Sequence, residues 1–518
     1  MLHDLLLGLL GFTGDVVQIR LESSSGKDRL ELNPNLKNLE TFEVDIIEGL
    51  LELGSMYMTL REFISSVQRD SRSSLYRMVI SKKLESEILT DYEADIENWE
   101  GRLLHLHAEG GVDVSLCALR LDLWDKYWQG FEALVDQVLP LASQDDVIDR
   151  VVDVQSRFRH RYMDIIVEGL RDCLMRELIS WCKYGIIAGG LFRSRFFIRE
   201  SLSSFEVDPL RVPSHLISTA LSAKVLFCGR TVMELQNGDK SKDVVVFSGM
   251  AFPHFDVNSL PIQIEEVRVF LSRQLCRKLK AETTPNLLDH LETIRGVFLM
   301  GYGDRWTSFI EESLGHNTSD LFASIFGLDQ EIVSMNQERL ITYELPRPMD
   351  LVISRDSFVK YNEIFRLLYR ITAASVRARY CYNMQLTNLY TSLLSYLQLD
   401  LIEGSFQKLV KTARTSEDVE VIASAHETFI AEVHLGSLVG VRSFEDCLDA
   451  IIKLSDNIAR DRHMEDIVDK QVRGEIEILI RNIADLQQRT VFKALEKLAL
   501  KLDYTNFYRG DQFILRDS

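Results

Sequence analysis

Apolar residues recur every three or four positions along most of the chain, which is the spacing of amphipathic helices. The pattern is clearest from Glu475 to Arg509, a stretch without proline or glycine. One apolar stripe in that stretch consists of Ile476, Leu479, Ile480, Ile483, Leu486, Val491, Leu495, Leu498 and Leu502. A second stretch without either residue runs from Met349 to Glu403. Because proline and glycine are the most unfavourable residues inside helices, both stretches are predicted to be helical.

Strand-like patterns are rare by comparison, and the clearest one, Val244–Phe247, is short. Turn-forming residues are also few. Gly110-Gly111 separates two helical blocks, and Pro253–Pro261 belongs to a loop-rich middle section. The pattern therefore predicts an all-α fold, an elongated stack of helical bundles with at most a minor short-strand element.

The amino-terminal stretch MLHDLLLGLLGFTGD is rich in leucine, as an export signal or membrane anchor would be. Its apolar run, Leu5–Phe12, is interrupted by glycines and is far shorter than the roughly 20 residues that span a bilayer. It also lacks the basic start and the cleavage site of a secretory signal. Apolar residues at positions 2, 5, 6, 9 and 10 instead predict a short helix with one buried face, ended by Gly11 or Gly14.

Composition narrows the possible functions. The 518 residues are 46% apolar and 26% charged, and the net charge is −19. We expect no nucleic-acid partner, because neutralising phosphates needs a positive field. The seven cysteines form no CxxC pair, which predicts reduced and mostly buried thiols, as in the cytosol. No segment has the length required for direct membrane insertion.

Charge is distributed unevenly along the chain. Residues 345–518 carry a net charge of −2, whereas residues 1–344 carry −17. Within 354–380 basic side chains prevail, and Arg366, Arg370 and Arg377 fall within about 40° of one another on a helix. One interpretation is a solvated helix face. The other is a docking stripe for an acidic protein partner.

No group of residues in the sequence points to catalysis. Gly301-Tyr-Gly303 begins like a dinucleotide-binding loop, but Trp306 stands where the third glycine belongs. His105-Leu-His107 has no third ligand, and its spacing separates the two rings on a helix, so we expect no metal site. We therefore expect a binding or scaffold protein rather than an enzyme, with no catalytic residues and no cofactor. The alternative is an all-α enzyme with a dispersed site.

Six blocks of sequence, including the amino-terminal stretch, match the motifs of a known family. They are MLHDLLLGLLGFTGD (1–15), WCKYGIIAGGLFRSRFFIRE (181–200), SAKVLFCGRTVMEL (222–235), HLETIRGVFLMGYGDRWTSFIEES (290–313), LPRPMDLVISRDSFVKYNEIFRLLYRI (345–371) and LALKLDYTNFY (498–508). In this order they resemble the γ-tubulin complex component family, the grip-motif or spindle-pole-body Spc proteins, and most of all its short component 4 type. Two departures are the missing acidic residues between Gly185 and Phe196, and Arg230 in place of the family's lysine.

The resemblance implies a rod-like stack of helical bundles in two parts. Residues 1–284, with the first grip region, would make lateral contacts between components, and residues 285–518, with the second, would bind γ-tubulin. The implied function is that of a structural subunit of a γ-tubulin ring complex, which templates microtubule nucleation at a microtubule-organising centre such as a centrosome or spindle pole. The implied location is the cytoplasm and cytoskeleton. The implied partners are γ-tubulin and other γ-tubulin complex components side by side.

We expect the γ-tubulin contacts on the helix within 354–380, where charges would orient the partner and aromatic anchors would supply affinity. The expected contact residues are Phe358, Tyr361, Phe365, Arg366, Tyr369, Arg370 and Arg377. The alternative is that Phe358, Tyr361 and Phe365, spaced by three or four residues, belong to the core. Lateral contacts are expected from the first helix, at Leu2, Leu5, Leu6 and Leu9. A second possible function is that of an all-helical scaffold or vesicle-tethering complex subunit.

Overall fold

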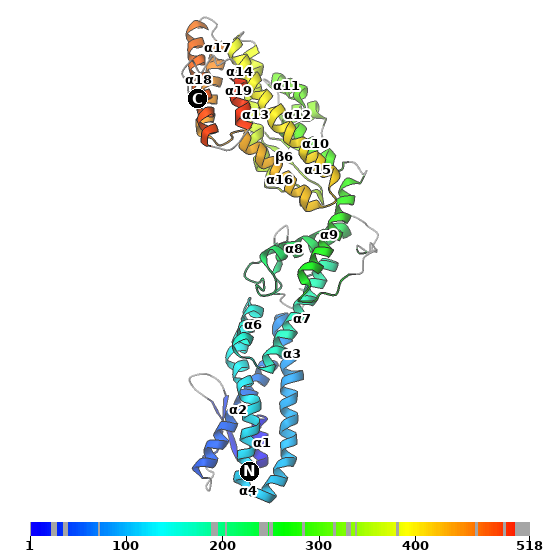
Figure 1. Cartoon of the computed structure of the whole chain (residues 1–518), viewed down its shortest axis with the longest axis vertical. Coiled ribbons are helices and arrows are strands. Elements are labelled where there is room, and N and C mark those ends of the chain that lie inside the picture. Colours follow the sequence, from blue (N-terminus) through cyan, green and yellow to red (C-terminus); the bar gives the residue numbers. More distant parts are fainter. Residues whose placement is uncertain are drawn as a thin grey trace, which may run out of the picture. The chain divides into compact units, whose positions relative to one another are not determined.

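The structure is a computed structural model, and it divides into two compact units, Met1–Leu271 and Ser272–Ser518, called unit 1 and unit 2 (Figure 1). The residues that it describes are 2–21, 28–34, 40–70, 73–187, 195–201, 205–237, 247, 252–281, 285–313, 318–327, 333–336, 339–379, 383–460, 465–489 and 494–502.

Unit 1, blue to green in Figure 1, consists of helices with two short hairpins. Its elements are α1 (Leu2–Leu9), β1 (Val17–Leu21), β2 (Asp28–Leu32), α2 (Thr41–Arg69), α3 (Leu75–Lys83), the π-helical η1 (Leu84–Leu89), α4 (Thr90–Ala133), the π-helical η2 (Leu134–Val138), α5 (Leu139–Leu141), α6 (Val147–Arg157), α7 (Arg161–Tyr184), β3 (Ile198–Glu200), β4 (Phe205–Val207), α8 (Thr219–Asn237) and α9 (Leu260–Lys280), which continues into unit 2.

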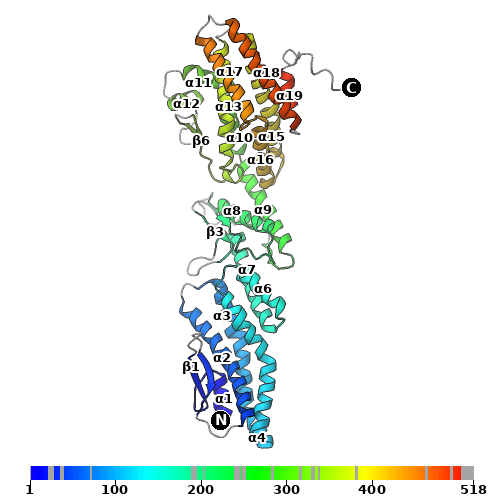
Figure 2. The same ribbon diagram turned by 90° about the vertical axis from the view of Figure 1, so that its left-hand side faces the viewer.

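Helix α1 confirms the interpretation of the amino-terminal stretch as a short packed helix. Leu5, Leu6 and Leu9 are buried. The helix is followed by Gly11, whose φ of 83° is favourable only for a residue without a side chain. The N–H of Phe12 donates to the carbonyl of Leu7, and that of Gly11 to Gly8, which is the hydrogen-bond pattern of a Schellman cap. Beside this helix, the β1–β2 hairpin packs on α2 (Figure 2).

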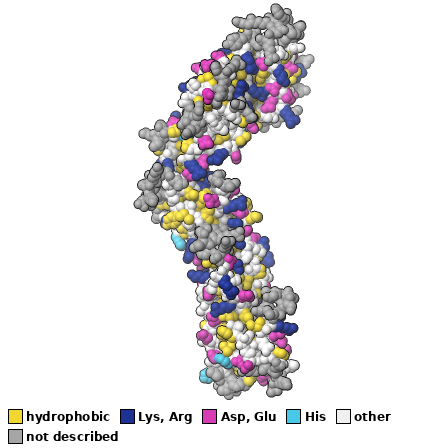
Figure 3. Space-filling model, turned by 180° about the vertical axis from the view of Figure 1, so that it is seen from behind, with side chains coloured by type: hydrophobic (Ala, Val, Ile, Leu, Met, Phe, Trp, Pro, Cys, Tyr) yellow, Lys and Arg dark blue, Asp and Glu magenta, His cyan; other side chains and the backbone are white. Residues whose placement is uncertain are grey.

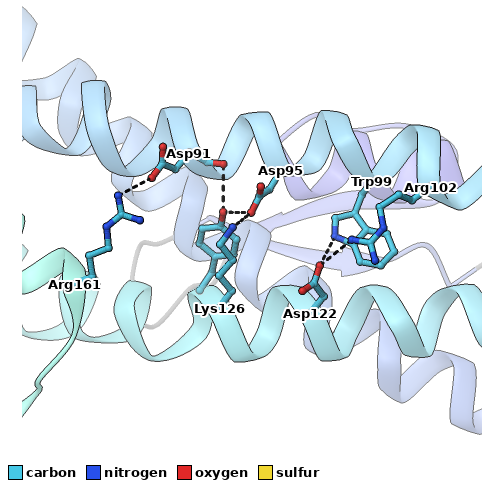
Figure 4. Close-up of polar contacts among 8 residues, drawn as sticks. Asp91, Asp95, Trp99, Arg102, Asp122, Lys126 and Arg161 are labelled. Carbon is cyan, nitrogen blue, oxygen red and sulfur yellow. Dashed lines mark hydrogen bonds and ion pairs between the residues drawn. The ribbon is translucent and has the colours of Figure 1, made fainter.

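The two ends of α4 lie side by side. Trp99 Nε1 donates to Asp122 Oδ2 over 2.9 Å, and Lys126 pairs with Asp95 (Figure 4). Twenty-three residues of straight helix would cover about 35 Å, so the chain must reverse direction between Arg102 and Asp122. The two blocks that Gly110-Gly111 separates in the sequence are therefore antiparallel neighbours.

Helices α7 and α8 approach each other unusually closely at a tryptophan and a glycine. Trp181 is fully buried, and its Nε1 donates to the carbonyl of Val225 over 2.8 Å. A Cβ atom on Gly229 would lie 2.0 Å from the Trp181 ring. Helix α7 then ends at Gly185, in the left-handed conformation at φ 67°. The close contact between α7 and α8 requires Trp181 and Gly229, and the left-handed end of α7 favours glycine at 185. These two requirements give a physical reason for the residues in two of the six sequence blocks.

Unit 2, green to red in Figure 1, is likewise helical. Its elements are α10 (Leu287–Phe298), α11 (Gly303–Glu312), α12 (Thr318–Phe326), β5 (Val333–Met335), β6 (Ile341–Tyr343), the 3₁₀ turn η3 (Met349–Leu351), α13 (Ser357–Ala378), α14 (Met384–Ser395), the π-helical η5 (Tyr396–Glu403), α15 (Gly404–Thr415), α16 (Val419–Gly436), α17 (Arg442–Arg460), α18 (Glu465–Arg489) and α19 (Ala494–Leu502).

Helix α13 is central to unit 2, where it packs against α10, α11, α14, α16 and α17. Its buried side is aromatic: the rings of Phe365 and Trp306 lie 5.1 Å apart, and Trp306 Nε1 donates to the carbonyl of Gly296 over 3.0 Å. A side chain on Gly296 would collide with Tyr302. Trp306 and Gly301-Tyr-Gly303 therefore form a packed helix junction in place of a nucleotide loop.

The all-α fold class is confirmed, since strands occur in the described residues only as three two-stranded antiparallel sheets. The strand expected at Val244–Phe247 lies, apart from Phe247, outside the described residues. The described cysteines are unpaired thiols; Cys117 is partly exposed and the rest are buried, while Cys381 lies outside the description. Among the described helices none is long and apolar enough to cross a bilayer.

Candidate protein-binding surface on helix α13

Helix α13 divides the predicted contact residues into three sets with different surroundings. Tyr361, Phe365 and Tyr369 are at most 5% exposed and belong to the core. This corrects the expectation that they touch a partner, because a buried ring has no surface to offer. The structure instead agrees with the alternative that Tyr361 and Phe365 are core positions.

Two neighbouring polar side chains of α13 fix the surrounding elements. The Tyr361 hydroxyl and His426 Nε2, on α16, are 2.9 Å apart in a fully buried hydrogen bond. Asn362 accepts a hydrogen bond from the N–H of Ile341 and donates to its carbonyl, at 2.9 and 3.0 Å, so it holds strand β6 beside the helix. Sequence reasoning missed His426 and Ile341, because separations of 65 and 21 residues leave no local signal.

The exposed edge of α13 and strand β6 enclose a groove of about 620 Å³. Phe358 lies half-buried in it, 5.8 Å from the ring of Tyr343. Val359 is 62% exposed at the groove, and Arg366 and Arg355 are exposed along it. Of the predicted residues, the structure thus brings Phe358 and Arg366 together at one accessible site. The sequence analysis did not predict Val359 or Arg355 as contact residues. Val359 could have been found, because it is an apolar residue on the polar side of the helix.

The charges around this groove are mixed. Arg355 and Arg366 have no ion-pair partner in the described part of the chain, whereas Glu363 is 2.7 Å from His434 Nε2. Glu344 and Asp350 also line the groove. Figure 3 shows acidic and basic side chains interspersed over the face that it displays, without a broad field of one sign. Charge in the groove can orient a partner, but the exposed apolar edge must supply most of the affinity.

The remaining two predicted arginines pair with helix α17. Arg370 pairs with Asp449, and Arg377 pairs with Asp456 over 2.9 Å. The two arginines are seven residues apart, and so are the two aspartates, so the two ion pairs lie two helical turns apart along the α13–α17 contact. Arg370 and Arg377 thus pair with acidic groups of their own chain, and of the three arginines only Arg366 lines the groove. A docking stripe that uses all three stays a prediction.

Reversing Arg370 and Arg377 to glutamate should weaken α13–α17 packing by about 0.2–1 kcal/mol per site, the range of exposed ion pairs. Adding Asp449→Arg and Asp456→Arg should restore part of the loss. Urea unfolding of the four combinations gives the coupling as a double-mutant cycle. Strictly additive effects would mean that these pairs contribute nothing to the contact.

The predicted lateral-contact residues at the amino terminus also face inward. Leu5, Leu6 and Leu9 are at most 4% exposed, and Leu2 is half-buried. Helix α1 packs against α2 and α4 of its own unit. The expectation that Leu5, Leu6 and Leu9 contact a neighbouring protein is therefore wrong. These leucines belong to the core, because their own unit already buries them.

The two halves of the chain each match a known family. Residues 2–282 match the family described as "Gamma tubulin complex component N-terminal", and residues 340–508 match "Gamma tubulin complex component C-terminal". The chain belongs to the γ-tubulin complex component family. The groove on α13 lies inside the second matched region.

Individual members of the γ-tubulin complex component family are distant in sequence. The chain is 21% identical to human "Gamma-tubulin complex component 4" and 18% identical to the mouse protein of that name, in both cases across 98% of each chain. It is 26% identical to the Arabidopsis thaliana protein "Gamma-tubulin complex component 4" across 38% of this chain and 31% of that protein. Similarity to component 4 over nearly the whole length agrees with the order of the six sequence blocks.

Proposed function

We propose that this protein is a structural subunit of a γ-tubulin complex, that it binds γ-tubulin through unit 2, and that it thereby helps to template microtubule nucleation at a microtubule-organising centre. Its role is positional. Nucleation is slow because several tubulins must associate before their contacts offset the entropy of association. A row of subunits that each hold one γ-tubulin removes much of this cost, as any multivalent array does.

The observation that carries the proposal is the α13 groove. It combines an accessible aromatic ring, an exposed valine and two arginines without ion-pair partners in the described chain: Phe358, Val359, Arg355 and Arg366. The two arginines can pair with carboxylates of a partner, because arginine forms strong, directional pairs with carboxylates, and the apolar side chains supply contact area beside them. We assign the contact to γ-tubulin because the groove lies within the region that matches the carboxy-terminal family model.

Arg366→Glu and Val359→Asp should each raise the Kd for purified γ-tubulin about tenfold, equivalent to about 1.4 kcal/mol. Both side chains are exposed, so folding should be unaffected. Lys408→Glu is the matched control, because Lys408 is an exposed cation on α15 away from the groove. Titration of the full chain with γ-tubulin measures the effect.

The outcomes of this titration separate two failures. A wild-type chain that shows no binding to γ-tubulin at micromolar concentration would overturn the proposed function. A wild-type chain that binds, with unchanged affinity in both groove variants, would overturn only the assignment of the groove.

A further inference from the structure

One surface of unit 2 carries positive charge with no negative charge on the same elements. Helix α15 contains Lys408, Lys411 and Arg414 and no acidic residue, whereas every other charged α-helix that lies wholly in unit 2 contains at least one. The adjoining part of α9, residues 272–281, also has only basic charges. Arg277 on α9 and the three cations of α15 are all exposed, and these four residues are called the basic ridge.

Hydrogen bonds join the two parts of the basic ridge. Lys280 Nζ on α9 donates to the carbonyls of Arg414 and Ser416, over 3.2 and 2.6 Å, at the end of α15. Cys276 Sγ also donates to the carbonyl of Ser416, over 3.5 Å. Arg277 belongs to the same turn of α9 and is exposed. The row of cations on α15 therefore continues onto α9.

The acidic residues that border the basic ridge are already compensated. Glu417 is 3.5 Å from Arg273, and Glu403 is 3.0 Å from Arg295. The four cations of the ridge, by contrast, have no ion-pair partner in the described part of the chain. Other exposed cations of unit 2 differ from them, since Lys453, for example, shares helix α17 with several acidic residues. Uncompensated positive charge is thus concentrated at the ridge.

Helix stability does not account for this concentration of charge. Cations in the last turn of a helix are favourable, because they interact with the negative end of the helix dipole. Only Arg414 lies in the last turn of α15. Lys408 and Lys411 precede that turn, and like charges three residues apart on a helix face repel each other. An anionic partner would relieve this repulsion.

The surroundings of the ridge favour an acidic protein segment over a nucleic acid. Phe406, the aromatic residue of α15, is buried, so the helix presents no ring on which a base could stack. The net charge of −19 also opposes a long polyanion, whose charges extend past the ridge. A short acidic segment interacts mainly with charges within the Debye length of about 10 Å. We propose that the basic ridge binds an aspartate- and glutamate-rich segment of another protein. This proposal does not rest on γ-tubulin binding.

The test measures fluorescence anisotropy of a labelled oligoglutamate peptide titrated with the full chain at low ionic strength. Arg277→Glu with Lys411→Glu should raise the Kd about tenfold, because each reversal replaces an attraction by a repulsion. Lys453→Glu with Lys497→Glu is the matched control. It makes the same change in net charge at two exposed lysines on α17 and α19, and it should change the Kd by less than about twofold.

The results separate the ridge from general electrostatics and from other partners. A wild-type chain that does not bind the peptide, or equal losses in the two double variants, would overturn the proposal. Tighter binding of a labelled RNA oligonucleotide of equal charge, lost in the ridge variant, would replace the acidic segment by a nucleic acid. The ridge variant should bind γ-tubulin with unchanged affinity and unfold in urea as the wild type does. Loss of γ-tubulin binding in the folded variant would assign the ridge to γ-tubulin instead.

Discussion

Replacing Gly229 by alanine is expected to destabilise unit 1 by about 3 kcal/mol, the upper end of ordinary overpacking. The added Cβ would lie 2.0 Å from Trp181 Cε2 and 2.3 Å from its Nε1. The indole cannot rotate away, because it is fully buried and hydrogen-bonded to the carbonyl of Val225. Helices α7 and α8 would have to separate, which exposes apolar surface on both.

Hydrogen exchange measured on peptides of α7 and α8 in the full chain would report this loss separately from unit 2. Gly474→Ala is the matched control. Gly474 also lies inside a helix, α18, but a Cβ there would meet nothing within 4 Å. Alanine should therefore stabilise its helix by about 0.5–1 kcal/mol through lower backbone entropy in the unfolded chain. Unchanged protection of α7 and α8 in the Gly229 variant would refute the close-packing argument.

Mild acid is expected to destabilise unit 2 through His426. Burial lowers the pKa of His426, Glu427 opposes this shift and nearby Lys360 adds to it, with a net pKa of about 4. An unfolded histidine has a pKa near 6.5, so between these values only the unfolded state takes up the proton. Stability is therefore complete above about pH 6.5 and falls as the pH drops toward 4. At pH 5 the loss from this one residue should be about 2 kcal/mol.

The double variant Tyr361→Phe with His426→Leu isolates this effect. It removes both partners of the buried hydrogen bond, so neither is left unsatisfied. Its stability should change less between pH 7 and pH 5 than that of the wild type, by about 2 kcal/mol. Tyr361→Phe alone retains the histidine and should keep the full acid dependence. Urea unfolding of unit 2 at the two pH values measures the difference, and an equal acid dependence in all three proteins would exclude His426 as its source.

Helix α13 shows how far the sequence alone carries a prediction of the site. Its periodicity identified the helix and placed Arg366, Arg370 and Arg377 on one side, and all three do lie outside the core. The sequence could not reveal that α17 supplies Asp449 and Asp456 to two of them. Ion pairing depends on which helix packs alongside, and residues some 80 positions apart carry no mark of that in a single sequence.

Aromatic residues were ambiguous for a related reason. Phe358, Tyr361 and Phe365 have the spacing of a core stripe and equally that of interface anchors, because both uses need large apolar surfaces at helical intervals. Only the surrounding helices decide between them. They cover Tyr361 and Phe365 and leave Phe358 half-buried at the groove.

The sequence by itself determined the helical class, the short packed first helix and the family, because these depend on periodicity, local turn chemistry and the order of the six sequence blocks. The tertiary structure alone decided which faces are free. It brought Trp181 onto Gly229, His426 onto Tyr361 and Asn362 onto strand β6, and it left Val359 exposed at the α13 groove. Exposure is a property of the packed chain: an apolar side chain becomes core or contact surface according to the neighbour that folding places against it.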